Sequence, residues 1–184
     1  MKIIGMTYID SKKAMYLKPD SALLVGGKPF FLPHFSEQIA VHPCVVVRIS
    51  RLGRYIEERF AARYYDGITT GMNLQAADLL TPPCPLDMWT RATGFDNSLV
   101  VGDWLPADVQ TDWKIGAEGE EHTYRTEDLT DSIEKSISEI SKYITIRMGD
   151  MIAIDFESDK RLLKKEEIWR GTADGRDVMY CKIK

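Results

Sequence analysis

The sequence predicts an α+β fold in which short strands outnumber the helices. Short apolar runs bounded by turn residues recur through the first third of the chain, which is typical of strands. One later segment has the periodicity of an amphipathic helix, and the chain ends on a hairpin pattern. Separate helices among many strands indicate an α+β domain. At 184 residues and 21.0 kDa, a single domain over residues 1–184 is expected.

The predicted strands are separated by glycine and proline turns. A turn at residues 116–119 predicts a hairpin within residues 113–124. Asp174 and Gly175 predict a second hairpin near the C-terminal end. Strands are expected at residues 3–6, 22–25, 30–32, 39–49, 68–74, 151–156, 168–170 and 178–183.

One helix is predicted in the middle of the first half. Ile56, Phe60 and Tyr64 recur at four-residue spacing, so residues 53–65 are expected to be helical. Gly67 is suited to the left-handed position that follows a helix. This helix would separate two strands of the sheet.

The strongest helical pattern lies in residues 130–143, with Thr130 as the expected N-cap. One or two helical turns are also expected in residues 75–80. The prolines of residues 81–85 predict a surface loop. The apolar stripe of the long helix is formed by Leu129, Ile133, Ile137, Ile140 and Ile144.

Composition limits the classes of function. The net charge is −4, from 28 acidic and 24 basic residues, which argues against nucleic acid and anionic membranes as partners. Three cysteines without close spacing argue against a disulfide framework and a zinc knuckle, and favour a reducing compartment. No apolar run approaches the roughly 20 residues that span a bilayer. A cytoplasmic protein is therefore expected.

The strand predicted over residues 39–49 carries two side chains that can bind a metal. Alternate residues of a strand share a face, so His42 and Cys44 are expected to point the same way. Pro43 between them removes a ladder hydrogen bond and is expected to bulge the strand. Imidazole and thiolate are ligands that suit zinc.

Several segments in order resemble the fumarylacetoacetate hydrolase family, in particular its short single-domain members. The resemblance covers about residues 16–156. The segments that carry it are Leu17-Lys18-Pro19-Asp20-Ser21-Ala22-Leu23, Arg48-Ile49-Ser50-Arg51-Leu52-Gly53, residues 65–79, Thr93-Gly94-Phe95-Asp96 with Gly102-Asp103-Trp104, and residues 146–152. This resemblance implies a β-rich mixed-sheet roll that forms a homodimer, binds Mg²⁺ or Mn²⁺ and acts on β-diketo or acylpyruvate acids.

The site positions depart from the family pattern. His42 and Cys44 stand where the family has two metal-binding glutamates, and Asn73 stands for a third carboxylate, an aspartate. Thr93 replaces the active-site lysine. Asp155 lies where the family has a Thr-Gly-Thr-Pro loop. By the same alignment, Asp96 is kept at a former-site position and Ala77 replaces an arginine.

These substitutions change the charge of the implied metal site. Three carboxylates give −3, whereas His42, a protonated Cys44 and Asn73 give about zero. Mg²⁺ prefers hard oxygen ligands and sheds water reluctantly, so we expect no Mg²⁺ or Mn²⁺ here. Zn²⁺ is a second alternative, with fewer ligands than zinc usually takes. A buried thiol and a hydrogen-bonded histidine are favoured over a metal site.

Three functional hypotheses follow. The first is a degenerate family member without the metal-dependent hydrolase site, which binds a small carboxylic acid or a protein partner. The second is an active hydrolase or decarboxylase of a β-diketo or acylpyruvate acid, with a site rebuilt from His42, Cys44, Asn73 and Thr93. The third is an accessory subunit of a catalytic paralogue. The sequence favours the first, because scaffold resemblance alone does not establish catalysis.

Overall fold

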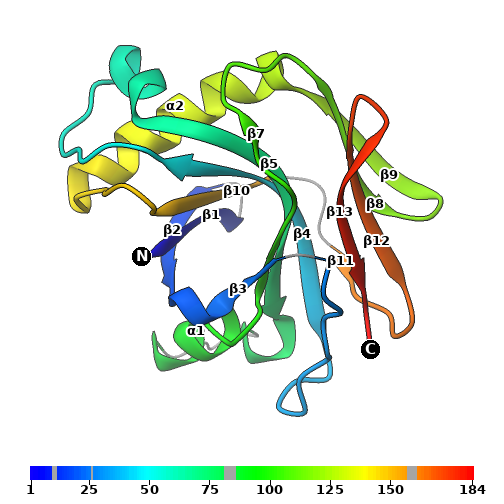
Figure 1. Ribbon diagram of the computed structural model, residues 1–184. Coiled ribbons are helices and arrows are strands. Elements are labelled where there is room, and N and C mark those ends of the chain that lie inside the picture. Colours follow the sequence, from blue (N-terminus) through cyan, green and yellow to red (C-terminus); the bar gives the residue numbers. More distant parts are fainter. Residues whose placement is uncertain (10–11, 26, 81–85, 157–160) are drawn as a thin grey trace.

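The structure, a computed structural model, confirms the β-rich α+β architecture (Figure 1). It describes residues 1–9, 12–25, 27–80, 86–156 and 161–184. A nine-stranded sheet contains β1 (Ile3–Ile9), β2 (Lys12–Lys18), β3 (Leu23–Leu24), β4 (Ile39–Ile49), β5 (Tyr65–Ala76), β6 (Leu99–Val101), β7 (Leu105–Pro106), β10 (Met151–Asp155) and β11 (Arg161–Leu162). A four-stranded sheet contains β8 (Asp112–Ala117), β9 (Glu120–Arg125), β12 (Ile168–Ala173) and β13 (Arg176–Lys182). The helices are α1 (Leu86–Thr93) and α2 (Thr126–Tyr143), with 3₁₀ segments η1 (Asp20–Ala22), η2 (Glu58–Tyr64) and η3 (Ala77–Leu80).

The strand order forces the large sheet to curl into a roll. Its main path runs β2-β1-β10-β4-β5-β6-β3, so β2 and β3 are the two ends. In a flat sheet these ends would lie about 29 Å apart, at about 4.8 Å per strand. Only η1 joins them, and the chain from Lys18 to Leu23 reaches at most about 17 Å. The ends must therefore approach each other and enclose an interior.

The outer face of the roll is apolar and covered. Helix α2 lies across β10 and β4, and the four-stranded sheet packs beside β4 and β5 (Figure 1). The α2 stripe of Ile133, Ile137 and Ile140 is buried against Val45 and Val47 of β4. Burial of this much apolar surface is the main source of stability on that face. The neighbouring sheet contributes Ile115, Trp169, Met179 and Cys181 against Val41, Met72 and Leu74.

The inner face of the roll is divided into an apolar and a polar part. Ile3, Val46, Leu99 and Ala153 form a small apolar cluster with Cys44. Beyond Cys44 the inward side chains become polar. Strand β4 is therefore buried on both faces, and its alternation separates an apolar outer face from a mixed inner one.

Several predictions from the sequence are confirmed. Both hairpins form, β8–β9 and β12–β13, with turns at residues 118–119 and 174–175. The long helix is present with its predicted apolar stripe. The short turns after residue 75 appear as η3.

Other predictions are wrong at the level of local structure. Residues 53–65 form no long helix; only the 3₁₀ segment η2 forms there, and Gly67 lies inside β5. Helix α2 begins at Thr126, so Thr130 is not its N-cap; its hydroxyl donates to the Thr126 carbonyl. The strand irregularity of β4 lies between Arg48 and Ile49 and not at Pro43.

Two elements were missed, and one prediction falls outside the described residues. Strand β2 and helix α1 have no clear periodicity in the sequence, and both contribute to the site described below. The loop predicted over residues 81–85, with Cys84, lies outside the described residues. No helix in the described ranges is long and apolar enough to cross a membrane.

Candidate functional site

The register of three central strands gathers the predicted site residues at one point. Across β4 and β5, His42 is directly opposite Asn73. Across β10 and β4, Asp155 is directly opposite Cys44. Residues that are opposite each other share a face of the sheet, so all four side chains point into the roll. The prediction that His42 and Cys44 share a face is confirmed.

Asn73 is the centre of the hydrogen-bond network. Its amide nitrogen donates to Oδ1 of Asp155 at 2.7 Å and to the hydroxyl of Tyr16. The amide nitrogen of Gln75 also approaches the Tyr16 hydroxyl, at 3.4 Å. Tyr16 belongs to β2 and reaches over β1 because Gly5 has no side chain. A Cβ at Gly5 would lie 2.4 Å from the Tyr16 ring.

Lys18 closes the roll from the inside. It belongs to β2, and its side chain is 2% exposed. Its Nζ donates to the carbonyls of Leu74 at 3.1 Å, Thr93 at 2.5 Å and Ser98 at 3.1 Å, and also to the Ser98 hydroxyl. These acceptors belong to the opposite end of the strand path. One ammonium thus ties β2 to β5 and to the segment that follows α1.

Burial brings an acid and a base in this cluster to similar pKa values. Burial raises the pKa of Asp155 to about 7, against hydrogen bonds from Asn73 and Thr7 and the charge of Lys18. Burial lowers the pKa of Lys18 to about 7, against the charges of Asp155 and Cys44. Loss of water drives each group toward its neutral form. The opposite charge of each group partly offsets the desolvation cost of ionising the other.

The thiol of Cys44 is held protonated. Burial raises its pKa well above the ordinary value, and Asp155 raises it further. The thiolate is the form that binds metals and attacks electrophiles. The prediction of a buried cysteine that packs as a small hydrophobe is confirmed, since Cys44 is fully buried in the apolar cluster of the inner face.

Two buried acceptor atoms in this cluster have no hydrogen-bond partner. They are Oδ1 of Asn73 and Oδ2 of Asp155. The imidazole Nδ1 of His42 lies 3.7 Å from this Asp155 oxygen, which is ion-pair range but too long for a hydrogen bond. Unpaired buried acceptors cost free energy and often mark places where function competes with stability.

The remaining former-site positions are arranged differently. The Thr93 side chain is turned into α1, where its hydroxyl donates to the Trp89 carbonyl at 2.7 Å. Thr93 therefore joins the cluster only through its backbone carbonyl, which accepts from Lys18. Asp96 is exposed on the surface. The side chains of Met72 and Phe156 pack in the apolar clusters of the outer face and not in the polar cluster.

Sequence reasoning missed Tyr16 and Lys18 as members of the cluster. Lys18 was within the Leu17-Lys18-Pro19 segment of the family resemblance, which was the available signal. The pattern gave no reason to place a lysine inside the roll, because buried lysines are rare. Only the closure of the strand path brings it next to Asp155.

The donor set does not fit a hard divalent cation. Among the described residues, no group of three His, Cys, Asp or Glu side chains is placed to hold a metal ion. At the position of the third carboxylate, the Asn73 amide turns its nitrogen toward Asp155. Cations such as Mg²⁺ take several oxygen ligands, and a neighbouring ammonium opposes them electrostatically.

A family model decides the relationship of this chain to known proteins. Residues 6–154 match the model described as "Fumarylacetoacetate (FAA) hydrolase C-terminal". The chain belongs to the fumarylacetoacetate hydrolase family. The family contains hydrolases, isomerases and tautomerases, as its named relatives show.

Individual relatives agree with this assignment over nearly the whole chain. The mitochondrial oxaloacetate tautomerase of Mus musculus is 25% identical over 98% of this chain and 90% of its own. The fumarylpyruvate hydrolase of Pseudomonas aeruginosa, solved with Mn²⁺ and pyruvate, superposes with a TM-score of 0.81 at 17% identity, covering 99% of this chain and 88% of its own. The 2-hydroxyhepta-2,4-diene-1,7-dioate isomerase of Mycobacterium marinum gives 0.81 at 21% identity, covering 99% and 73%. The structural matches show the fold.

Proposed function

We propose that this protein does not perform the metal-dependent C–C bond hydrolysis known in its family, and that it serves as a binding module for a small carboxylic acid. The observation that supports the proposal is the internal pairing of the polar cluster. The amide of Asn73 is engaged by Asp155 and Tyr16, and the ammonium of Lys18 by three carbonyls. An amide nitrogen and an ammonium that are held in this way point donors, and not ligand oxygens, into the cluster, which does not suit a cation.

The charge of the cluster leads to the same conclusion. A metal-bound keto acid is activated because the cation stabilises negative charge that develops on its oxygens. Here Cys44 stays protonated, Asn73 is neutral, and burial raises the pKa of Asp155 to about 7, which favours its neutral form. Loss of such electrostatic stabilisation raises a reaction barrier by several kcal/mol. The family reaction would therefore be slow here even if the substrate bound.

A second candidate function is a metal-free tautomerase or isomerase. Its active site would also be a rebuilt one, but for a different reaction from the hydrolysis or decarboxylation considered above. The unpaired Oδ2 of Asp155 and its pKa of about 7 favour it, because a general base works best near the ambient pH. Asp155 would take a proton from the carbon beside a keto group and return it to the rearranged substrate. The burial of Asn73 and Asp155 places this candidate second, since the substrate needs access.

The test is an assay of two reactions with protein purified without a metal-binding tag. Acetylpyruvate hydrolysis and oxaloacetate tautomerisation are each followed with Mn²⁺ and with a chelator. The proposal predicts no hydrolysis above the buffer rate in either condition. Mn²⁺-dependent hydrolysis that disappears in Asn73→Ala would contradict it.

The same assay separates the second candidate from the first. Tautomerisation in the presence of chelator that is lost in Asp155→Asn would establish a metal-free enzyme in place of a binding module. Asp96→Asn is the matched control, because Asp96 is exposed and stands outside the cluster. The homodimer, the catalytic paralogue as partner and the cytoplasmic location remain predictions.

A further inference from the structure

We propose that two adjacent loops at one end of the roll form a docking surface for an acidic segment of another protein. The first loop, residues 50–55, follows β4, and the second, residues 144–149, follows α2. The inference goes beyond the proposed function and does not depend on it. The first loop begins after Ile49, which lies about 23 Å along β4 from His42 of the polar cluster, at about 3.3 Å per residue. The loop patch consists of the exposed side chains Arg51, Leu52, Tyr55, Arg147 and Met148.

Backbone hydrogen bonds hold the two loops side by side. At one end the Ile49 amide donates to the Asp150 carbonyl, and the Gly149 amide donates to the Ile49 carbonyl, each at 2.8 Å. At the other end Gly53 and Ile146 exchange two hydrogen bonds of 3.0 Å. The two loops lie together at the left of Figure 1, in cyan and in gold. The surface is therefore formed before a partner binds, which avoids the cost of ordering loops.

The apolar side chains of the loop patch are unusually exposed. Met148 is 78% exposed, Tyr55 70% and Leu52 69%. These are the three most exposed large apolar side chains among the described residues. Single exposed apolar side chains are ordinary on protein surfaces, but a group of them in one place marks an interaction site.

Tyr55 is held in a strained conformation that presents its ring. Its φ is +54°, in the left-handed region that bulky residues rarely adopt. Its amide donates to the Ser141 carbonyl at 3.0 Å. The Arg54 guanidinium lies 4.6 Å from the centre of the Tyr55 ring and also donates to the Lys142 carbonyl at 3.2 Å. A conformation that neighbours hold against its strain points to a functional constraint on this loop.

The charge of the loop patch selects an acidic partner. Arg51 and Arg147 are exposed, and neither guanidinium has a hydrogen bond or ion pair with any other residue that the structure describes. The acid beside the second loop, Asp150, is 3% exposed and accepts from Lys2 and from the Arg147 amide. A guanidinium binds a carboxylate with two parallel hydrogen bonds. A segment with both acidic and apolar side chains complements the loop patch.

The same charges argue against a second copy of this chain as the occupant. A two-fold axis through the loop patch would bring Arg51 and Arg147 of one copy close to the same two residues of the other. Like charges placed against each other in an interface oppose association. A different protein avoids this repulsion, so we infer a partner of another sequence.

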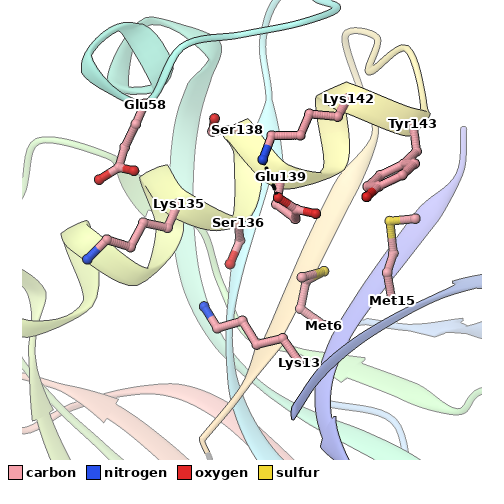
Figure 2. Close-up of a pocket in the computed structure, with 10 residues that line it drawn as sticks. All are labelled: Met6, Lys13, Met15, Glu58, Lys135, Ser136, Ser138, Glu139, Lys142 and Tyr143. Carbon is pink, nitrogen blue, oxygen red and sulfur yellow. Dashed lines mark hydrogen bonds and ion pairs between the residues drawn. The ribbon is translucent and has the colours of Figure 1, made fainter.

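The neighbouring groove between α2 and strands β1 and β2 has no such preference. Its volume is about 620 Å³, and it is lined by three lysines and two glutamates (Figure 2). Lys142 is paired with Glu139, and Lys135 is paired with Asp131. Charges that are already paired on the same helix select no ligand. The unpaired arginines distinguish the loop patch from this groove.

The test is a selection from a library of random short peptides displayed on phage. Peptides are retained on the wild type and counter-selected on the double variant Arg51→Gln/Arg147→Gln. The inference predicts that the retained peptides combine acidic with apolar residues. One of them is labelled with fluorescein and titrated against each variant by fluorescence anisotropy. Its affinity should fall by about tenfold or more in the double variant and should weaken with added salt.

Two further variants separate this surface from general attraction of an acidic peptide. Arg170→Gln/Arg176→Gln removes the same charge from exposed positions of β12 and β13 and should leave the affinity unchanged. Leu52→Ser/Met148→Ser keeps both arginines of the loop patch and should also weaken binding by about tenfold, because apolar burial is lost. Circular dichroism checks that every variant folds.

Each other outcome overturns the inference. One is that no acidic peptides are retained, and another is that a retained peptide binds the wild type and Arg51→Gln/Arg147→Gln equally. Sedimentation of the wild type as a dimer that this variant abolishes would show that a second copy covers the loop patch. Binding to phosphatidylserine vesicles in place of peptides, lost in the same variant, would identify a membrane surface. The proposed function would stand in each case, because it concerns the inner cluster.

Discussion

The two faces of strand β4 are stabilised by different kinds of interaction. On the outer face, Val45 and Val47 pack against the apolar stripe of α2. On the inner face, His42 and Cys44 belong to a cluster of hydrogen bonds and charges. The outer face tolerates change gradually, because lost methylene groups add up. The inner face is all-or-none, since removal of one partner leaves the others buried and unpaired.

The largest effect is expected from breaking the inner face at Lys18. Lys18→Met removes the donor shared by the carbonyls of Leu74, Thr93 and Ser98, and it removes a positive charge that lowers the pKa of Asp155. Each buried acceptor left without its donor costs about 1–3 kcal/mol, so a loss of about 4 kcal/mol in the free energy of unfolding is expected. Urea denaturation measures it.

Its matched control is a lysine on the surface. Lys142→Met removes an exposed ion pair with Glu139 and is expected to cost about 0.5 kcal/mol or less. If Lys18→Met cost no more than Lys142→Met, the inner cluster would not stabilise the roll.

A truncation on the outer face should cost slightly less. Ile137 is fully buried in the α2 stripe, and Ile137→Ala is expected to lower the free energy of unfolding by about 3 kcal/mol. Ile137→Val should cost about 1 kcal/mol, because the cavity is smaller. A graded response in urea denaturation would support the comparison of the two faces. Equal costs for Ala and Val would contradict simple apolar packing.

A substitution at Gly5 tests how tightly Tyr16 of β2 packs over β1. In Gly5→Ala the new methyl would lie 2.4 Å from the Tyr16 ring and push it away from Asn73. Overpacking of this kind costs about 1–3 kcal/mol. In a Tyr16→Ala background the cost should largely disappear, as a double-mutant cycle measures. An unchanged cost would show that the backbone of β1, and not the ring, resists the methyl group.

Asp155 should give the protein an unusual pH dependence. Its pKa is raised to about 7 in the fold, whereas an unfolded aspartate titrates at about 3.9. Between these values the folded state binds the extra proton, so this group makes stability fall as pH rises from about 4 to about 7. The pKa of Lys18 is lowered from about 10.4 in the unfolded chain to about 7 in the fold. The unfolded state therefore binds the extra proton above about pH 7, so this group makes stability rise again there.

Asp155→Asn should therefore flatten the acid side of this profile. Thermal unfolding midpoints measured from about pH 5 to 7 should fall less steeply than in the wild type. Asp66→Asn, which changes an exposed aspartate paired with Arg48, is the control and should leave the slope as it is. Parallel profiles for wild type and Asp155→Asn would contradict a raised pKa.

The sequence could predict the outer face better than the inner one. The periodicity of Ile133, Ile137 and Ile140 identified the packed side of α2, because a helical stripe is a local signal. The alternation of β4 likewise placed His42 and Cys44 together. Family resemblance added the β-rich fold and the positions of Asn73 and Asp155.

The rest of the inner face depends on closure of the roll. Tyr16 meets Asn73, and Lys18 meets the Leu74 carbonyl, only because β2 and β3 are joined by a short segment, a fact about topology and not about local pattern. The helix expected over residues 53–65 failed because three apolar residues at helical spacing do not outweigh the surrounding context. Asp96 is a former-site position by resemblance, and it is exposed in the structure, so its role stays a prediction.

The central claim is that the inner cluster, in which two buried acceptor atoms are unpaired, does not bind a hard divalent cation. Titration of Mn²⁺ followed by electron paramagnetic resonance tests this most directly, because Mn²⁺ that binds the protein no longer contributes to the signal of the free ion. The account predicts that the free-ion signal stays undiminished up to about 1 mM Mn²⁺, the weak end of protein cation sites. Stoichiometric loss of the signal that is restored by Asn73→Ala would contradict it and return the protein to the metal-dependent members of its family.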